Sequence, residues 1–158
     1  MRAFADCGVS AARLARLRKA AQEARRANYA RYSKLTVLAA VETADGVFGG
    51  TNVENLNYTL TKHAEEVAVL AAMLAGAGPR GQWINALYVT GISPCGSCRQ
   101  FVTEFAGPKT VILIDRIKQR QVKSGKLSSL GDSSIEAWSL GELLPTAFSP
   151  REVAASKR

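Results

Sequence analysis

The 158-residue sequence lacks the features that define several classes of protein. No apolar run approaches the roughly 18 residues of a membrane-spanning helix, which excludes an integral membrane protein. Three cysteines are too few, and odd in number, for a disulfide-stapled scaffold. The stretch 1–26 has no apolar segment followed by a small-residue cleavage site, so we expect no secretory signal and a cytoplasmic protein. Its arginines and few acids leave an organelle transit peptide as a lesser alternative.

Enough apolar material is present for one folded domain. Hydrophobic residues make up 47% of the chain and charged residues 22%, which excludes wholesale disorder. Domains usually contain roughly 100–200 residues, so we predict a single domain over 1–158.

The net charge of +8 is concentrated at the two ends of the chain. Residues 1–34 hold nine Lys and Arg against two Asp and Glu, and residues 116–158 hold eight against four. The middle, 35–115, holds four against seven and is mildly acidic. A nucleic-acid enzyme would carry its positive charge around its chemistry, so we interpret the basic ends as solvated surface.

Hydrophobic spacing predicts the element order α-β-β-α-β-α-β-α. The expected helices cover 10–29, 63–74, 95–105 and 139–144, and the expected strands cover 35–41, 47–53, 84–90 and 110–115. A basic N-terminal helix is thus expected within 1–30, a basic loop at 116–134 and a flexible tail at 149–158. Strands alternating with helices predict a three-layer α/β domain with a mixed sheet.

The strongest chemical signal is a pair of short motifs at two predicted helix starts. One is His63-Ala64-Glu65, and the other is Pro94-Cys95-Gly96-Ser97-Cys98. Cys95 and Cys98 are three residues apart, so their sulfurs point the same way on a first helical turn. With His63 they offer three protein ligands to zinc and leave a fourth position for water, which is the arrangement of catalytic zinc.

The charges of this ligand set favour catalysis. Two thiolates and a neutral imidazole make the zinc site formally neutral, which preserves Lewis acidity and allows water to be activated near neutral pH. Glu65, two residues after His63, is the candidate to carry a proton between that water and a leaving group. Alone, the C-x-x-C spacing also fits a thioredoxin-like redox pair. Together, the H-x-E and P-C-x-x-C motifs match the signature of zinc deaminases.

At these residues the chain resembles the cytidine deaminases of the small type with one zinc motif. The resemblance runs from about Ala27 to Phe148. It includes the segments 28–35 and 51–55, the segment 93–100 followed by 104–105, and the segment 142–145 with Phe148. It implies a three-layer α-β-α fold with a mixed sheet of about five strands, one zinc ion per chain and a homotetramer. It also implies hydrolytic deamination of cytidine or deoxycytidine to the uridine product and ammonia, in pyrimidine salvage.

The resemblance further implies roles for individual residues. Glu65 is the catalytic acid and base, and His63, Cys95 and Cys98 bind the metal. The implied substrate contacts are made by Asn52 and Glu54 to the ribose, by the backbone of Ala64 and Ser93 to the leaving amino group, by Leu35 at the base, and by Phe148 in the site of a neighbouring subunit.

Several positions depart from the family pattern. His63 stands where small tetrameric members usually carry Cys, and Glu66 stands where they often carry Arg; since His already removes one thiolate charge, the two changes are mutually consistent. Leu35 replaces a phenylalanine that stacks on the base, which forfeits about 0.5–1.5 kcal/mol of ring contact. A modified cytosine nucleoside, such as a nucleoside antibiotic, therefore remains an alternative substrate.

Two other hypotheses would require features that a nucleoside deaminase does not need. A deaminase of single-stranded polynucleotides would need basic, aromatic-rich sequence around the zinc motifs, and this chain lacks it there. A non-catalytic zinc module would close its site with a fourth protein ligand and would have no need of Glu65.

Overall fold

The computed structural model describes residues 8–78, 81–125, 127 and 135–148. Cys7, the predicted tail at 149–158 and much of the predicted loop, at 126 and 128–134, lie outside the described residues.

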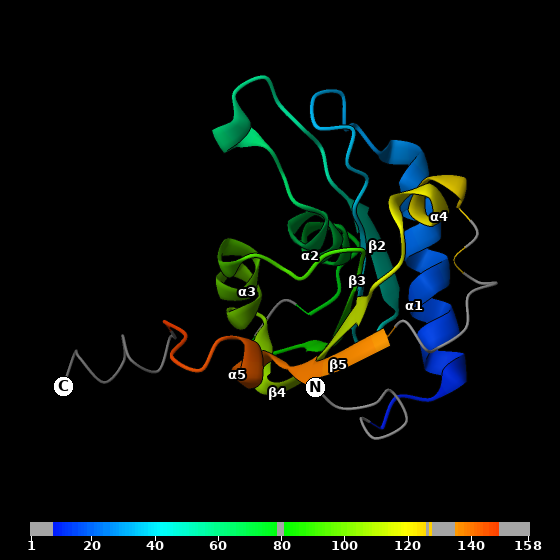
Figure 1. The fold of residues 1–158 in the computed structure, drawn as a ribbon. Helices are drawn as coiled ribbons and strands as arrows, with labels where there is room; N and C mark the ends of the chain where they lie inside the picture. Colours follow the sequence, from blue (N-terminus) through cyan, green and yellow to red (C-terminus); the bar gives the residue numbers. More distant parts are fainter. Residues whose placement is uncertain (1–7, 79–80, 126, 128–134, 149–158) are drawn as a thin grey trace.

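Among the described residues, five strands form one mixed sheet in the order β2-β1-β3-β4-β5 (Figure 1). They are β1 (Leu38–Glu42), β2 (Val47–Thr51), β3 (Ile84–Thr90), β4 (Ala106–Asp115) and β5 (Ile135–Ser139). β3 and β4 are parallel, and the other neighbouring pairs are antiparallel. The mixed sheet is confirmed. The element order read from hydrophobic spacing missed β5, a five-residue edge strand of alternating burial.

In the part of the chain that the structure describes, α-helices and short 3-10 turns accompany the sheet. The helices are α1 (Ala11–Ala24), α2 (Ala64–Leu74), α3 (Gly96–Thr103), α4 (Gln119–Ser124) and α5 (Leu140–Leu143), and the turns are η2 (Arg25–Ala27) and η3 (Tyr58–Leu60). The predicted cap of α1 is confirmed, because Ser10 Oγ accepts a hydrogen bond from the Arg13 amide at 3.2 Å. Within the described part of the chain, no helix is both long and apolar enough to cross a membrane.

The prediction of a loop throughout 116–134 is wrong at α4. The Gln121 side chain accepts a hydrogen bond from the Lys118 amide at 3.0 Å, and Gly125, with φ of 69°, ends the helix. Val122 is the buried residue of this helix. One apolar side chain in a six-residue helix gives no detectable period in the sequence.

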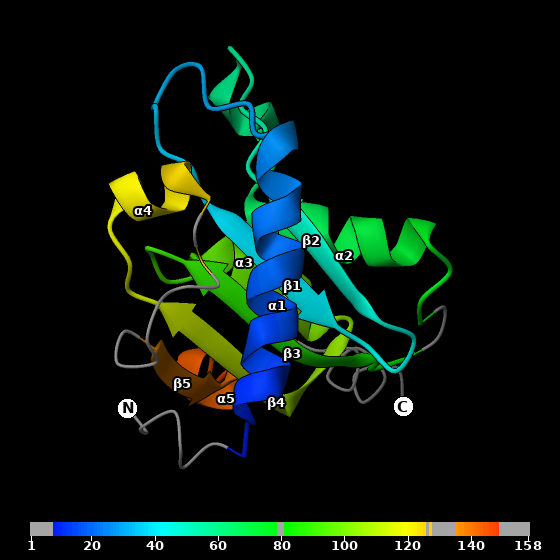
Figure 2. The same ribbon diagram turned by 90° about the vertical axis from the view of Figure 1, so that its right-hand side faces the viewer.

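The helices cover both faces of the sheet, which confirms the three-layer architecture. Figure 2 shows α1 lying across one face, and α2, α3 and α5 lie on the opposite side of the sheet in Figure 1. Side chains alternate between the two layers along each strand, since Leu87 and Val89 of β3 join the core with α2 and α3, whereas Ala86 and Tyr88 join the core with α1.

Two adjacent glycines in β2 allow helices to approach the sheet on both faces. A Cβ atom at Gly49 would overlap the backbone of Ala20 in α1, and a Cβ atom at Gly50 would overlap the backbone of Ala64 and Ala68 in α2. The Gly49-Gly50 pair therefore sets how closely α1 and α2 pack.

The segments that carry the predicted chemistry lie at one end of the strands. Because β3 and β4 are parallel and β1 runs against them, the carboxyl ends of β3 and β4 lie beside the amino end of β1. The loop after β3 leads directly into α3. Ligand sites in α/β sheets commonly lie beyond the carboxyl ends of parallel strands.

Candidate active site

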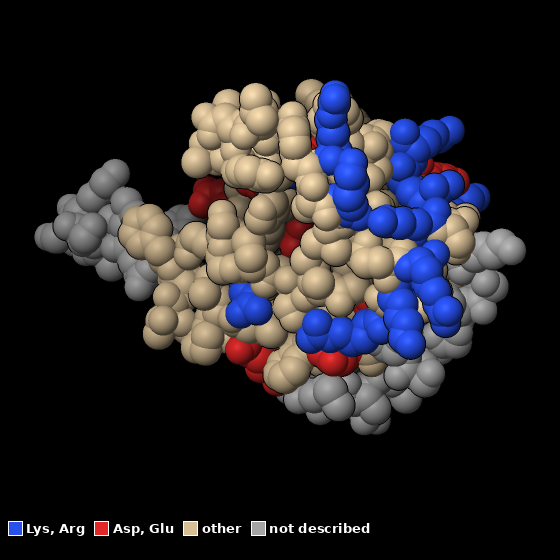
Figure 3. Space-filling model, turned by 45° about the horizontal axis from the view of Figure 1, so that its top comes forward, with Lys and Arg blue, Asp and Glu red and all other residues tan. Residues whose placement is uncertain are grey.

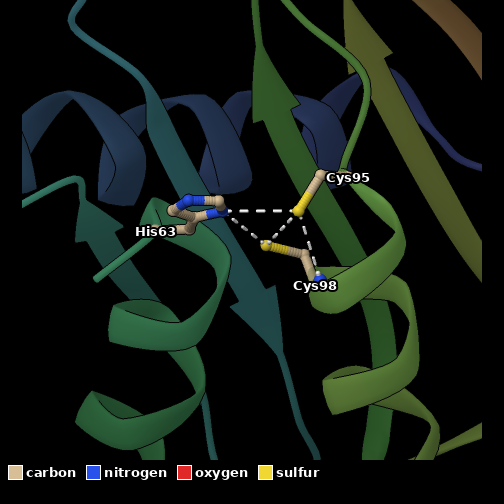
Figure 4. Close-up of side chains that lie close together, drawn as sticks. All are labelled: His63, Cys95 and Cys98. Carbon is tan, nitrogen blue, oxygen red and sulfur yellow. Dashed lines mark hydrogen bonds between the residues drawn. The ribbon is translucent and has the colours of Figure 1, made fainter. Parts of the chain in front are cut away.

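The starts of α2 and α3 bring the three predicted metal ligands together (Figure 4). His63 and Cys95 are the N-cap residues of the two helices, and Cys98 lies in the first turn of α3. His63 Nδ1 lies 3.2 Å from Cys98 Sγ and 3.4 Å from Cys95 Sγ, and the two sulfurs are 3.6 Å apart. The side chains thus converge on one point from sequence positions 32 and 35 residues apart.

This triangle has the dimensions of a zinc site. A tetrahedral zinc ion with bonds of about 2.3 Å to sulfur and about 2.0 Å to nitrogen separates two sulfurs by about 3.8 Å and a sulfur from a nitrogen by about 3.5 Å. The observed separations are within a few tenths of an ångström of these values. A disulfide would need sulfurs about 2.05 Å apart, so the two cysteines are free thiols. The cluster fits one zinc ion per chain.

The two cysteines sit in different surroundings. Cys95 is exposed, whereas Cys98 is 1% exposed, and burial raises the pKa of the Cys98 thiol. A buried thiol becomes a thiolate readily only beside a positive charge, and a divalent cation at this point supplies one. The chemistry of the donor set therefore agrees with its geometry.

Glu65 lies two residues after His63, in the first turn of α2, and is 4% exposed. Burial raises the pKa of its carboxyl group above the ordinary value. A carboxyl group with a raised pKa is suited to both accept and release a proton near neutral pH.

Glu66 stabilises the backbone at the start of α2. Its carboxylate accepts a hydrogen bond from the His63 amide at 2.9 Å, as the third residue of a capping box does. Glu66 and His63, the two residues that differ together from the expected family pattern, are therefore also joined by a hydrogen bond.

A pocket of about 180 Å³ opens beside the metal triangle. Eight of the ten predicted site residues line it: Leu35, Asn52, Glu54, His63, Ala64, Glu65, Ser93 and Cys95. Cys98 belongs to the metal triangle but does not line the pocket. Four further residues line it that the sequence analysis did not name: Ser33, Val37, Thr61 and Ile92. Ser33 lies within the segment 28–35 that carries the family resemblance, so this segment could have identified it.

Asn52 is held by the backbone of the neighbouring pocket segment. Its Nδ2 donates to the Leu35 carbonyl at 2.9 Å, and its Oδ1 accepts from the Val37 amide at 2.9 Å and from Asn28 Nδ2 at 2.9 Å. These bonds fix the amide orientation and support the chain on both sides of residue 36.

Glu54 is an ionised acceptor in the same wall. Its carboxylate accepts hydrogen bonds from the Ser33 hydroxyl, from the Tyr32 amide at 2.7 Å and from the Ser33 amide at 3.2 Å. The Ser33 hydroxyl is the main cause that holds the pKa of Glu54 below its ordinary value. Lys34, which follows Ser33, adopts a left-handed backbone conformation with φ of 60° in this turn.

Phe148 does not reach the pocket of its own chain. It is 67% exposed, and its backbone exchanges hydrogen bonds with the Gln100 side chain on α3 at 2.6 and 3.1 Å. Its predicted place in the site of a neighbouring subunit stays a prediction.

A larger cavity of about 600 Å³ holds none of the predicted site residues. Its lining is largely apolar and includes Met73 at the end of α2, Trp83, Phe105 and Leu140. The polar groups that chemistry needs converge on the smaller pocket instead.

Positive charge gathers away from the metal triangle. Figure 3 shows Lys and Arg concentrated over the side formed by α1 and α4, whereas the side of α2 and α3 carries few. Exposed residues on the basic side include Arg16, Lys19, Arg25, Arg26, Lys118, Arg120 and Lys123. This distribution agrees with a solvated basic surface.

Comparison with known proteins agrees with the geometry of the site. The family profile described as "Cytidine and deoxycytidylate deaminase zinc-binding region" matches residues 12–114. A cytidine deaminase of Sporosarcina psychrophila is 32% identical over 122 residues, which cover 73% of this chain and 76% of the relative. The crystal structure of the cytidine deaminase from Burkholderia pseudomallei has a TM-score of 0.65 and 36% identity, and the match covers 84% of this chain and 96% of that chain. The structure of the Mycobacterium tuberculosis cytidine deaminase has a TM-score of 0.62 and 34% identity, covering 84% and 94%.

The profile spans both motifs that form the metal triangle, and the structural matches extend over most of the chain. The chain therefore belongs to the cytidine deaminase family of zinc-dependent hydrolases that act on nucleosides.

Proposed function

We propose that this chain deaminates cytidine and deoxycytidine hydrolytically to uridine and deoxyuridine, with release of ammonia. One observation carries the proposal: the His63, Cys95 and Cys98 triangle lies beside buried Glu65 at a pocket lined by the residues expected to contact a nucleoside. The overall reaction adds water at C4 of the cytosine ring, breaks the bond from C4 to the amino nitrogen and leaves the uracil carbonyl.

His63, Cys95 and Cys98 would hold the zinc ion. When bound, zinc supplies a Lewis acid that lowers the pKa of a water molecule toward about 7. Glu65 would take a proton from the attacking water and deliver it to the departing amine. Its burial beside the triangle excludes bulk water from that transfer.

The remaining pocket residues would orient the nucleoside. Glu54, kept ionised by Ser33, would accept a hydrogen bond from a ribose hydroxyl, and the Asn52 amide would engage the same sugar. The backbone of Ala64 and Ser93 would lie against the leaving amino group, and Leu35 would contact the base. An aliphatic side chain at the base tolerates substituents that an aromatic platform would reject, which makes analogues of cytidine informative substrates.

Phe148 would complete the pocket of a second copy of the chain in a homotetramer. Its exposed ring on a backbone fixed by Gln100 is available for such a contact. Sedimentation or light scattering of wild type and of Phe148→Ala tests this assembly and the contribution of the ring to KM.

The central test uses purified protein loaded with one equivalent of zinc. Cytidine, deoxycytidine and a modified cytosine nucleoside are added separately, and the loss of ultraviolet absorbance is followed with and without a chelator. Activity that disappears with the chelator and returns with zinc supports the proposal. Absence of ammonia release from every cytosine nucleoside contradicts it.

The role of Glu65 has its own test. We predict that Glu65→Gln keeps one zinc per chain and lowers kcat by about 100- to 10,000-fold, because the amide cannot carry the proton. Glu104→Gln is the matched control, since Glu104 is exposed and does not line the pocket. Undiminished turnover in Glu65→Gln would contradict the assigned role.

A further inference from the structure

Arg116 connects the edge strand β5 with the loop that leads into α3. It follows β4 directly, and its Nε and Nη2 donate to the two carboxylate oxygens of Glu136 on β5 at 2.9 and 3.0 Å. The same Nη2 donates to Ser93 Oγ at 3.0 Å. The two-pronged contact with Glu136 fixes the guanidinium plane and therefore the direction of the bond to Ser93.

Gln119 makes the equivalent connection to a second pocket segment. Its Oε1 accepts from the Thr36 amide at 3.0 Å, and its Nε2 donates to the Thr36 carbonyl at 2.9 Å. Thr36 is buried between Leu35 and Val37, which both line the pocket. One amide side chain thus satisfies both backbone groups of a residue that lies 83 positions away in the sequence.

The four residues 116–119, which we name the brace, therefore hold two pocket-lining segments at once. The brace is itself anchored, since Ile117 is buried in the core beneath α1 and its amide donates to the Asp115 carbonyl at 2.7 Å. The Gly91 amide donates to the same carbonyl at 2.7 Å, at the start of the loop that carries Ser93. The positions of the two segments relative to each other consequently depend on Arg116 and Gln119.

We propose that Arg116 and Gln119 are positioning residues that set the spacing between Leu35 and Ser93, and hence how closely the pocket fits the cytosine ring. This inference rests on the proposed function, in which Leu35 contacts the base and Ser93 faces the amino group. Neither Arg116 nor Gln119 lines the pocket or belongs to the metal triangle, so both act through the residues they hold. Small displacements of such supporting contacts change catalysis strongly because bound substrate must keep its geometry.

The Arg116–Glu136 ion pair should contribute little to the free energy of folding. The Arg116 side chain is 40% exposed, and exposed ion pairs contribute little to folding. Loss of the pair should therefore alter kinetics and local order more than the melting temperature.

The test compares two brace variants with two matched controls. Gln119→Glu keeps the acceptor for the Thr36 amide but replaces the donor with an oxygen facing the Thr36 carbonyl, and Arg116→Gln removes the fork that holds Ser93. Gln121→Glu introduces the same charge on the same helix and keeps its acceptor for the Lys118 amide, and Arg120→Gln removes an exposed arginine of α4.

We predict that each brace variant lowers kcat/KM for cytidine about tenfold, chiefly through KM, with one zinc per chain retained. A looser pocket should penalise a bulkier base less, so the ratio of kcat/KM for 5-methylcytidine to that for cytidine should rise at least threefold. Merely partial unfolding would lower both substrates equally. In a Ser93→Ala background, Arg116→Gln should have no further effect, because Ser93 Oγ is the contact through which Arg116 acts.

Amide hydrogen exchange provides a readout that does not depend on turnover. Exchange should accelerate at 35–37 in Gln119→Glu and at 91–93 in Arg116→Gln, with both controls unchanged. Unaltered exchange in these segments, or an unchanged substrate ratio in an active brace variant, would overturn the proposal. Wild-type protein that lacks cytidine deamination would instead contradict the proposed function, and the exchange experiment would still decide the brace.

Discussion

Replacing Gly50 by alanine would place a methyl group against the backbone of α2, where Ala64 and Ala68 leave no room. The obstructing atoms are backbone atoms, which cannot rotate aside, so α2 must shift as a body. Overpacking of this kind costs about 1–3 kcal/mol. For a chain of this length, 1 kcal/mol corresponds to roughly 2–4 °C in Tm, so we predict a decrease of roughly 2–12 °C.

The displacement should also reach the metal. α2 begins at His63 and carries Glu65 in its first turn, so a shifted helix moves one ligand away from the two cysteines of α3. Perturbing the support of a metal ligand lowers affinity by about 10- to 100-fold, and we expect zinc affinity to fall in this range. Competition with a chromogenic chelator measures the affinity, and circular dichroism measures Tm.

Gly49→Ala is the matched control on the opposite face of the same strand. Its methyl group would meet the backbone of Ala20 in α1, which carries no metal ligand. We predict a similar loss of Tm with zinc affinity close to wild type. Wild-type affinity in Gly50→Ala, or equal losses of affinity in both variants, would refute the argument that Gly50 positions the metal-binding helix.

Two further predictions concern the core and the sugar contact. Tyr88→Phe removes the donor to Asp115 at 2.7 Å in a fully buried network with Arg18, and we predict a loss of about 1–2 kcal/mol in the free energy of unfolding by urea, with unchanged KM. Ser33→Ala removes the main cause that lowers the pKa of Glu54. Ionised Glu54 is the form that binds the sugar, and its lowered pKa keeps it ionised as the pH falls. Without the Ser33 hydroxyl this pKa rises, so Glu54 is protonated at a higher pH. The acid limb of the KM profile for cytidine should therefore move to higher pH in Ser33→Ala. Unchanged stability in the first variant, or an unmoved acid limb in the second, would contradict these assignments.

The metal triangle was predictable because its determinants are local. Cys95 and Cys98 occupy one helical turn, and His63 and Glu65 occupy another, so spacing alone indicates which groups share a direction. The second part of β4 was predictable for the same reason, since the apolar run from Thr110 to Asp115 favours a buried strand, whereas the part from Ala106 to Lys109 contains Gly107 and Pro108 and was not predicted.

The brace was not predictable, because its contacts depend on the order of strands. Arg116 meets Ser93 only when β3 and β4 are neighbours in parallel, and Gln119 meets Thr36 only when β1 lies beside β3. In the sequence these side chains lie in a basic, polar stretch that resembles ordinary solvated loop. Helix α4 was missed with them, since its single buried valine produces no pattern.

The metal triangle joins two helix starts that are more than thirty residues apart in the chain. An ion held there is a removable cross-link, so the protein's resistance to heat becomes a function of free zinc concentration by mass action. At a concentration one hundred times the dissociation constant, such a cross-link adds about 2.7 kcal/mol to the folded state. A chelating buffer would thus lower the melting temperature of the protein as well as remove the metal on which the proposed activity depends.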